Sequence, residues 1–330
     1  MLLYCTVTLA MPLFDSSSPA SCSTAQRLSD VSPTSTMATM VSDMANNALD
    51  ESTAVNEHQE KHDVATELNY WDDPGDGSRP TPIYIGKGHI TNERPHRPHR
   101  FVVSDVSGDE DRYTLDSHGF QYIRHESKEK DFVDEQRIRA EYYPECAQAL
   151  QDVTGASRIH VFNHKVRRGP THWHHLGLKN LANRGPVTKT HVDQSYDGAE
   201  KRLRWELPEE ADELIKKRYQ IINVWRPIKT IYKDPVAVAN ANSVPDADLV
   251  GAEMIEDGFR GESWVVRHNP THHWYYKHGL KTDEVLLIKC FDSDKSVARR
   301  ALHSAFEDPA YCSMEHRQSI EVRCLVFYDT

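Results

Sequence analysis

Residues 317–328 read RQSIEVRCLVFY and form one of the clearest strand patterns in the chain. β-Branched, aliphatic and aromatic side chains dominate the stretch, as is typical of a strand within a sheet. Five similar runs precede it, with turn residues between them: YQIINVWRPI, PVAVANANSV, GESWVVRHN, HHWYYK and EVLLIKCFDS. Because no helical segments separate these strands, this half of the chain predicts an antiparallel barrel or sandwich and not a doubly wound sheet.

Upstream of these strands the pattern becomes helical in two places. Apolar residues recur every fourth position between Asp131 and Gly155, which predicts a helix that Pro144 breaks or restarts. Residues 157–168, SRIHVFNHKVRR, have a strand pattern. Residues 207–218, LPEEADELIKKR, predict a short amphipathic helix, with acidic residues first and basic residues last as the helix dipole prefers.

The N-terminal part has a different composition. Residues 1–66 are rich in Ser and Thr and show no regular hydrophobic period, which predicts a disordered tail. Aromatic residues and Pro-Gly turns begin near Glu67, so residues 67–330 are expected to form one folded domain. The initial run MLLYCTVTLAMPLF is apolar but lacks the basic residues that begin a secretory signal.

Charge and cysteine content argue against several classes of protein. The 330 residues include 39 Lys and Arg against 50 Asp and Glu, a net charge of −11 that disfavours binding to nucleic acid. No apolar run approaches the roughly 20 residues that span a bilayer, so no membrane association is expected. The six cysteines show no C-x-x-C spacing, which favours reduced thiols and a cytoplasmic location.

A candidate metal site lies in residues 189–198, KTHVDQSYDG. Alternate residues of a strand point to the same side, so His191 and Asp193 can present a nitrogen and an oxygen to one ion. Two histidines and one carboxylate on Fe(II) leave three positions for other ligands. The H-x-D spacing is weak evidence alone, because it is common by chance and a surface turn explains it equally well.

The third ligand must come from elsewhere in the chain. His303 is favoured, because Arg317 follows it after a short gap and opens a strand. His272 and His273, at the start of HHWYYK, are rivals that no such arginine follows. The order of H-x-D, a distant His and then R-x-S resembles the Fe(II)/2-oxoglutarate oxygenases. The run THWHH, residues 171–175, could instead bind zinc, although a solvated loop is the simpler explanation.

The resemblance narrows to one family. Several blocks occur here in the same order as in the hydroxylase/desaturase family typified by the aspergillic-acid hydroxylase, among them LDSHGFQ, TGASRIHVFNHKVRR, RGPVTKTHVDQSY and HSAFEDP. That family includes a cephalosporin-methoxylating component and fungal natural-product enzymes. The resemblance runs from about Leu68 to the end and implies a mainly β fold, a cupin-like double-stranded β-helix or jelly roll with flanking α-helices. A loop from Thr171 to Asn183 is inserted relative to the family.

The resemblance also implies functional residues. Three residues would be both iron ligands and catalytic residues: His191, Asp193 and His303. Arg317 is the expected anchor for the distal carboxylate of 2-oxoglutarate, since a guanidinium forms paired bonds with a carboxylate, and Ser319 can add a hydrogen bond. Arg323 is the second candidate at the cofactor site, and its ordinary role is an ion pair with a carboxylate on a neighbouring strand.

The implied reaction uses Fe(II), 2-oxoglutarate and O2 to hydroxylate or desaturate a small molecule of secondary metabolism. Arg167, Trp225 and Arg226 are candidates for lining the substrate cavity, although a strand end, a core Trp and an ion-paired Arg are ordinary roles for them. Two other functions remain open. One is a metal-dependent enzyme on the same barrel without oxidation, and the other is a non-catalytic partner of a second biosynthetic enzyme.

Overall fold

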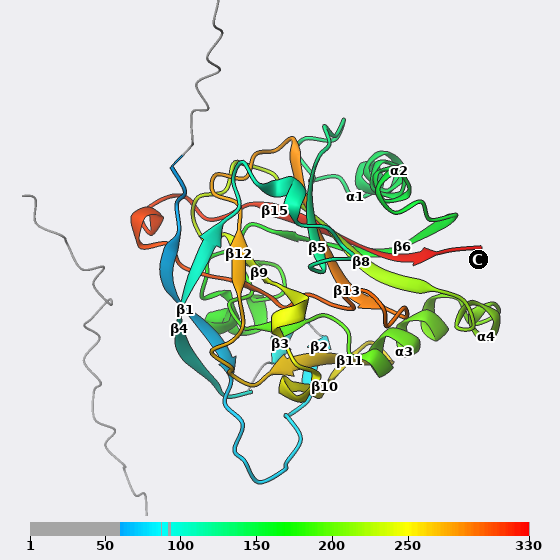
Figure 1. Ribbon diagram of the computed structural model, residues 1–330, viewed down its shortest axis with the longest axis horizontal. Coiled ribbons are helices and arrows are strands. Elements are labelled where there is room, and N and C mark those ends of the chain that lie inside the picture. The colour runs from blue at the N-terminus through cyan, green and yellow to red at the C-terminus, as the bar shows by residue number, and fades with distance from the viewer. Residues whose placement is uncertain (1–59, 87, 92–93, 330) are drawn as a thin grey trace, which may run out of the picture. The chain divides into compact units, whose positions relative to one another are not determined.

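Two β-sheets form the centre of the described chain, residues 60–86, 88–91 and 94–329 of a computed structural model (Figure 1). The larger sheet contains, in spatial order, β1 (Val64–Trp71), β4 (His96–Asp105), β12 (Trp274–Tyr276), β9 (Val236–Ala239), β14 (His303–Ala305), β7 (His191–Val192), β11 (Phe259–Val266), β10 (Leu249–Glu256), β2 (Ile83–Gly86) and β3 (His89–Thr91). The smaller sheet contains β5 (Phe120–Arg124), β13 (Glu284–Asp292), β8 (Tyr219–Pro227), β15 (Ser319–Phe327) and β6 (Arg158–Arg167).

The smaller sheet is antiparallel throughout and has both faces covered. Every residue of β8 and of β13 is buried, which explains why their sequences lack the alternation of a half-exposed strand. Side chains on one face, such as Ile222 and Val224, pack with the helix α2, whereas Ile221 on the other face packs with residues of the larger sheet. The prediction of a mainly β jelly roll is confirmed, and each of the six expected strand runs contains a strand.

The helix expected between Asp131 and Gly155 forms in three parts. α1 (Glu135–Arg137) begins at Asp134, whose side chain accepts hydrogen bonds from two backbone amides, and a π-helical turn η2 (Ile138–Tyr142) follows. α2 (Tyr143–Thr154) has Pro144 in its first turn, where a missing N–H costs nothing, and ends at Gly155 in the left-handed conformation. α2 packs against β6 and β15 of the smaller sheet (Figure 1).

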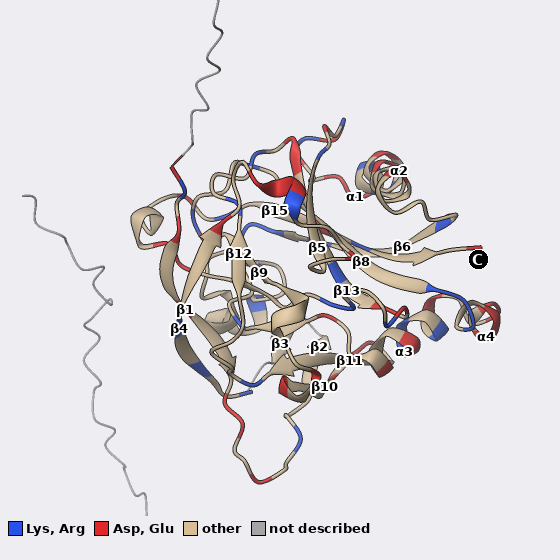
Figure 2. Cartoon of the chain, in the orientation of Figure 1, with Lys and Arg blue, Asp and Glu red and all other residues tan. Residues whose placement is uncertain are grey.

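The prediction of a helix over residues 207–218 is wrong for most of its length. Only α4 (Ala211–Leu214) is helical there, because Leu207 leaves the helical conformation at the end of α3 and Pro208 cannot donate a helical hydrogen bond. The longer helix is α3 (Tyr196–Glu206), which Ser195 caps and which packs on β11. Figure 2 shows acidic and basic residues side by side along α3 and α4.

The remaining features of the fold are the start of the first strand and the shorter helices. β1 begins at Val64, so the expected boundary between residues 66 and 67 falls inside a strand, and residues 1–59 of the expected tail lie outside the described residues. The described residues also form short 3-10 helices: η1 (Glu110–Arg112), η3 (Trp173–Lys179), η4 (Ala241–Ser243), η5 (Asp246–Asp248) and η6 (Pro309–Tyr311). None of the helices in the described part of the chain combines the length and apolar character needed to cross a bilayer.

Candidate metal centre

His191 and His303 lie opposite each other on two adjacent strands of the larger sheet. β7 and β14 pair antiparallel with these two residues in register, and their ring centroids are 4.4 Å apart. Asp193 follows β7 and projects to the same side as His191, as alternate strand residues do. One ligand atom from each of the three side chains lies within 4.8 Å of the others, so the fold brings together the trio that the sequence suggested.

Backbone carbonyls orient both imidazole rings. His191 Nδ1 lies 2.7 Å from the Lys189 carbonyl oxygen, and His303 Nδ1 lies 3.3 Å from that of Ala301. Each Nδ1 therefore carries the hydrogen, and each Nε2 offers a lone pair toward Asp193 Oδ1, at 3.4 Å from His191 and 4.0 Å from His303. His303 Nε2 is buried and has no hydrogen-bond partner within the described chain, a costly arrangement that a bound cation would relieve.

The smaller sheet holds the other oxygen of the carboxylate. Asp193 Oδ2 accepts a hydrogen bond from Asn223 Nδ2 at 2.7 Å and pairs with Arg323 at 3.0 Å, which leaves Oδ1 directed at the two histidines. Burial alone would raise the pKa of Asp193, but Arg323, followed by the two histidines, holds that pKa well below its usual range. Burial, and next His191, lowers the pKa of His303 to about 4. At neutral pH Asp193 is therefore ionised and His303 neutral, as a divalent cation requires of these two ligands.

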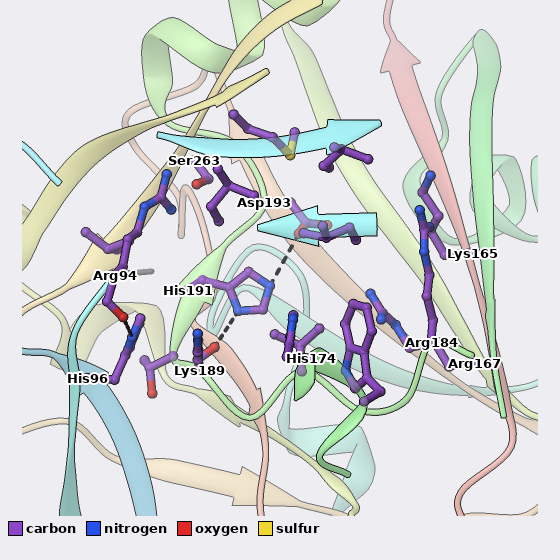
Figure 3. Close-up of a pocket in the computed structure, with 18 of the residues that line it drawn as sticks. Arg94, His96, Lys165, Arg167, His174, Arg184, Lys189, His191, Asp193 and Ser263 are labelled. Carbon is purple, nitrogen blue, oxygen red and sulfur yellow. Dashed lines mark hydrogen bonds and ion pairs between the residues drawn. The ribbon is translucent and has the colours of Figure 1, made fainter. Parts of the chain in front are cut away.

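Two cavities border the trio. The larger, of about 150 Å³, is drawn in Figure 3 with His191 at its centre, and the smaller, of about 30 Å³, includes His303 and Arg317 in its wall. Five residues line both cavities: Arg167, Val187, His191, Asp193 and Arg323. The candidate metal centre is thus open to two spaces of different composition, one on each side.

The smaller cavity contains Arg317, the expected anchor for 2-oxoglutarate. Its guanidinium lies over the Trp225 ring, 5.3 Å from the centroid, and one Nη donates to the Asp234 carbonyl oxygen at 2.8 Å. Arg317 Nε and Ser319 Oγ are buried, and neither has a hydrogen-bond partner among the residues that the structure describes. Burial, and next Arg167, lowers the pKa of Arg317 to about 10. The side chain is therefore still positively charged at neutral pH and can bind a carboxylate.

Arg323 lies on β15 and lines the smaller cavity together with Arg317, which precedes the strand, and its guanidinium forms ion pairs with two carboxylates. Asp193 Oδ2 lies at 3.0 Å and Glu321 Oε1 at 2.7 Å. The ion pair expected for Arg323 is present, but one of its two partners is Asp193, the candidate metal ligand. The pair therefore has more than a purely structural role. Arg323 therefore acts on the cofactor site through the position and charge of Asp193.

The three candidates for substrate contact have different positions. Arg167 and Trp225 line the smaller cavity, and Arg167 also lines the larger. Arg226 does not, which corrects the sequence-based expectation. Successive strand residues point to opposite faces, so Arg226 points toward α2, where it donates to the Tyr142 hydroxyl at 3.0 Å and to the Thr282 carbonyl oxygen at 2.7 Å.

The rival histidines have other partners or other positions. His272 is buried with Nδ1 2.9 Å from the Tyr70 hydroxyl and Nε2 3.0 Å from Asp248, so both ring nitrogens are already used. His273 is exposed. In the inserted loop, only His174 faces the larger cavity, and His172 and His175 are exposed, which leaves no zinc trio in THWHH.

Sequence reasoning missed most of the larger cavity. Its wall includes Arg94, Lys165, Arg184, Lys189 and His174. Two of them could have been found from strand periodicity, because Lys165 shares its face with Arg167 and Lys189 precedes His191 by two residues. Arg94, Arg184 and His174 come from other segments, and only the folding of the chain brings them to the cavity. In the described chain, a second trio of His62, His278 and Asp308 also has ligand atoms within 4.8 Å of one another.

The chain is similar to one family model and to several known fungal proteins. A family model described as an oxidoreductase/YMDC permease-like domain matches residues 68–327. The hydroxylase/desaturase CTB9 of Cercospora beticola is 36% identical over 320 residues, which is 91% of this chain and 98% of that protein. The hydroxylase/desaturase efuI of Hormonema carpetanum is 34% identical over 287 residues, covering 81% and 95%.

Two further matches are informative. The alpha-ketoglutarate-dependent dioxygenase phiK of a fungal species is 35% identical over 220 residues, which is 66% of this chain and 80% of that protein. Among solved structures, the iron and alpha-ketoglutarate-dependent endoperoxidase NvfI superposes with a TM-score of 0.68 over 81% of this chain and 98% of that one. Its sequence identity is 23%, so this likeness establishes the shared fold alone.

Proposed function

The chain belongs to the family of fungal hydroxylases/desaturases, and from that premise we propose that His191, Asp193 and His303 hold its iron. The protein is an Fe(II)/2-oxoglutarate-dependent dioxygenase that oxidises a small molecule. When bound, the iron supplies the oxidation of an unactivated C–H bond by O2. 2-Oxoglutarate is converted to succinate and CO2, and the substrate gains a hydroxyl group or loses two hydrogens as water.

In this proposal the residues of the smaller cavity bind the co-substrate. Arg317 Nε, in the wall of the smaller cavity and without a partner in the described chain, would donate a hydrogen bond to the distal carboxylate of 2-oxoglutarate. Ser319 Oγ is also buried without a partner and is the candidate for a second bond, although Ser319 does not line the cavity. Trp225 beneath the guanidinium and the Asp234 carbonyl oxygen fix the orientation of Arg317. The co-substrate would then lie in the smaller cavity and extend from Arg317 toward His303, since both residues line that cavity.

The remaining residues position the ligands. Lys189 and Ala301 fix the imidazole tautomers through their carbonyl oxygens, and Asn223 with Arg323 restrains Asp193. Such partners typically change metal affinity ten- to a hundredfold when they are removed. They also keep Asp193 ionised in a buried site, where an unpaired carboxylate would be costly.

The observation that supports this function best is the unpartnered His303 Nε2, directed at the same point as His191 Nε2 and Asp193 Oδ1. The test is to add Fe(II) and then 2-oxoglutarate to purified protein without oxygen and to follow the metal-to-ligand charge-transfer band. We expect one iron per chain and a band that saturates with 2-oxoglutarate. A protein that binds a metal but forms no band would be a non-oxidative enzyme or an inactive partner of another enzyme.

We further propose that residues 67–330 include the whole catalytic domain and that the preceding residues form a tail. The Ser/Thr-rich composition of the N-terminal residues supports a tail, and β1 moves the start of the domain from residue 67 to Val64 or before. Deleting residues 1–59 should leave the unfolding temperature and the iron content nearly unchanged, and a large fall in either would contradict it. We also propose a cytoplasmic location, supported by the buried free thiols of Cys146, Cys290 and Cys324.

A further inference from the structure

The larger cavity has a strongly basic wall. Six arginine and lysine side chains line it: Arg94, Lys165, Arg167, Arg184, Lys189 and Arg323. Among its lining residues Asp193 is the sole carboxylate, and Arg323 already pairs with it. In a chain whose net charge is −11, this concentration of positive charge in one partly closed space points to an anionic ligand.

The basic residues form two groups on opposite sides of His191. Figure 3 shows Arg94 and Lys189 on one side of the ring, and Lys165, Arg167 and Arg184 on the other. Apolar side chains from four strands, β2, β3, β10 and β11, complete the wall: Ile83, Ile85, Ile90, Met254 and Val265. A ligand that fits this wall has a hydrocarbon body and at least one acidic group.

The group of Lys165 and Arg184 is the less compensated of the two. Arg94 donates to the carbonyl oxygens of Thr81 at 2.6 Å and Glu253 at 2.5 Å, so its guanidinium has structural partners. Arg184 Nε is buried and has no hydrogen-bond partner within the described chain. The nearest carboxylate oxygen to Lys165 belongs to Glu256 at 3.8 Å, beyond hydrogen-bond distance.

The burial of these cations close to one another lowers their pKa values. Burial, and next the charge of Arg184, lowers the pKa of Lys165 to about 8. Burial, and next Arg167, lowers that of Arg184 to about 10. Both side chains are still charged at neutral pH, so an anion between them would remove an electrostatic cost that the folded protein otherwise retains.

The proposed cofactors do not remove this surplus. The charges of iron, Asp193, 2-oxoglutarate and Arg317 balance one another, and Arg323 is balanced by Glu321. Glu256 opposes the charges of Lys165 and Arg184 in part. Arg167 is opposed by Glu321 and Asp193, which already balance Arg323 and the iron. A second anion, distinct from 2-oxoglutarate, is therefore needed to complete the site.

We propose that the substrate is an amphiphilic carboxylic acid whose carboxylate binds Lys165 and Arg184 and whose hydrocarbon body lies on Ile83, Met254 and Val265. This position would bring a C–H bond of the hydrocarbon toward the side of the cavity that His191 and Asp193 form. The inference rests on the proposed function, because it assigns the distal carboxylate of 2-oxoglutarate to Arg317 and so leaves the larger cavity to the substrate.

The test uses octanoate as a carboxylate probe and 1-octanol as its neutral counterpart. Both are titrated by calorimetry, without oxygen, into protein loaded with iron and 2-oxoglutarate, whose charge-transfer band is recorded first. We expect octanoate to bind and 1-octanol to bind at least tenfold more weakly. Lys165→Gln and Arg184→Gln should each weaken octanoate about tenfold or more, whereas the exposed controls Lys128→Gln and Arg79→Gln should not.

The possible outcomes separate the two proposals. If no charge-transfer band forms, the proposed function fails whatever octanoate does. If the band forms but octanoate binds no better than 1-octanol, or binds the two cavity variants as tightly as the controls, the inference is wrong. If Lys165→Gln and Arg184→Gln lose affinity for 2-oxoglutarate and not for octanoate, the basic group serves the co-substrate, which also overturns the inference.

Discussion

The described part of the protein contains two clusters of two histidines and one aspartate, which share composition and spacing but differ in their hydrogen bonds. The first consists of His191, Asp193 and His303, and the second of His62, His278 and Asp308. In both, one ligand atom from each residue lies within 4.8 Å of the others. Residue type and proximity therefore do not distinguish them.

The difference lies in which polar atoms already have partners. In the second cluster, His62 Nε2 is 2.8 Å from Asp308 Oδ2, and His278 Nε2 is 3.3 Å from the Tyr311 hydroxyl. Asp308 Oδ1 accepts a hydrogen bond from the Ala310 amide at the start of η6. No buried side-chain polar atom of these three described residues lacks a partner, so the cluster is satisfied without an ion.

In the first cluster, the hydrogen bonds and the ion pair are formed by the atoms that face away from the centre of the trio. Asn223 and Arg323 bind the outer oxygen of Asp193, and backbone carbonyls bind the Nδ1 atoms, which leaves three lone pairs directed at one point. This cluster also borders two cavities, whose walls include no residue of the second cluster. We conclude that a candidate metal centre is recognised by its unsatisfied inner atoms and satisfied outer atoms.

The largest expected effect tests this distinction directly. His191→Ala, Asp193→Ala and His303→Ala should each abolish turnover and reduce bound iron below about a tenth of the wild-type value, because each removes one of three protein ligands. His62→Ala, His278→Ala and His272→Ala should keep their iron. Iron is measured by mass spectrometry of the reconstituted proteins, and turnover by succinate release.

The opposite pattern would reverse the comparison. Iron retained in His303→Ala but lost in His278→Ala would make the second cluster the metal centre. Circular dichroism spectra and unfolding temperatures of all six variants show whether a loss of iron reflects a loss of fold.

The next largest effect concerns the cavity that only the first cluster borders. Arg317→Ala should raise the KM for 2-oxoglutarate about a hundredfold, because a charge-assisted pair of hydrogen bonds is lost. Iron binding should change little, since Arg317 bonds to none of the three ligands. The matched control is Arg226→Ala, an arginine buried on the opposite face of the same sheet. An unchanged KM in Arg317→Ala would show that another cation holds the co-substrate.

A smaller effect is expected from the outer bonds of Asp193. Asn223→Ala removes one of the two partners of Oδ2 and should weaken iron binding about tenfold, with the affinity for 2-oxoglutarate on the loaded protein unchanged. Competition with a chelator measures the iron affinity. The exposed Asn183→Ala serves as the control. Equal iron affinity in both variants would mean that Arg323 alone restrains Asp193.

The sequence predicted the barrel and the trio because both rest on short-range periodicity. Asp193 follows β7 two residues after His191, and Arg317, Glu321 and Arg323, which are alternate or near-alternate residues, line one cavity. His303 was ranked first through its order relative to Arg317. Its position opposite His191 could not be derived, because strand pairing between distant segments is set by the whole topology.

The basic cavity and the helices were harder to predict for the same reason. Arg94, Lys165 and Arg184 come from three separate segments, and only the folded chain reveals that they share one wall. The sequence placed the charged helix at residues 207–218, whereas the structure has its longer helix, α3, at Tyr196–Glu206. In the structure Gly198 lies against β11, where a Cβ atom would come within 2.0 Å of the Glu262 carbonyl oxygen, so the glycine permits close packing of a helix.

The smallest effect is a pH dependence that belongs to the second cluster. Burial, and next the ring of His62 at 4.3 Å, lowers the pKa of His278, although Asp105 and Asp308 oppose this shift. The unfolded chain therefore takes up a proton at His278 at a higher pH than the folded chain does. Where the unfolded state binds more protons, stability rises with pH, so His278 contributes stability above about pH 6.5 that is lost as the pH falls.

His278→Gln should therefore reduce the difference in the free energy of unfolding between about pH 8 and about pH 5.5, measured by urea denaturation. Other buried groups also titrate in this range, so only the difference from wild type is informative, and the exposed His273→Gln should behave as wild type does. Zinc added to the wild type should not raise its stability through this cluster, because His62 and Asp308 already satisfy each other. A stabilisation by zinc that His278→Gln abolishes would show that the second cluster binds metal, and the distinction between the two clusters would no longer hold.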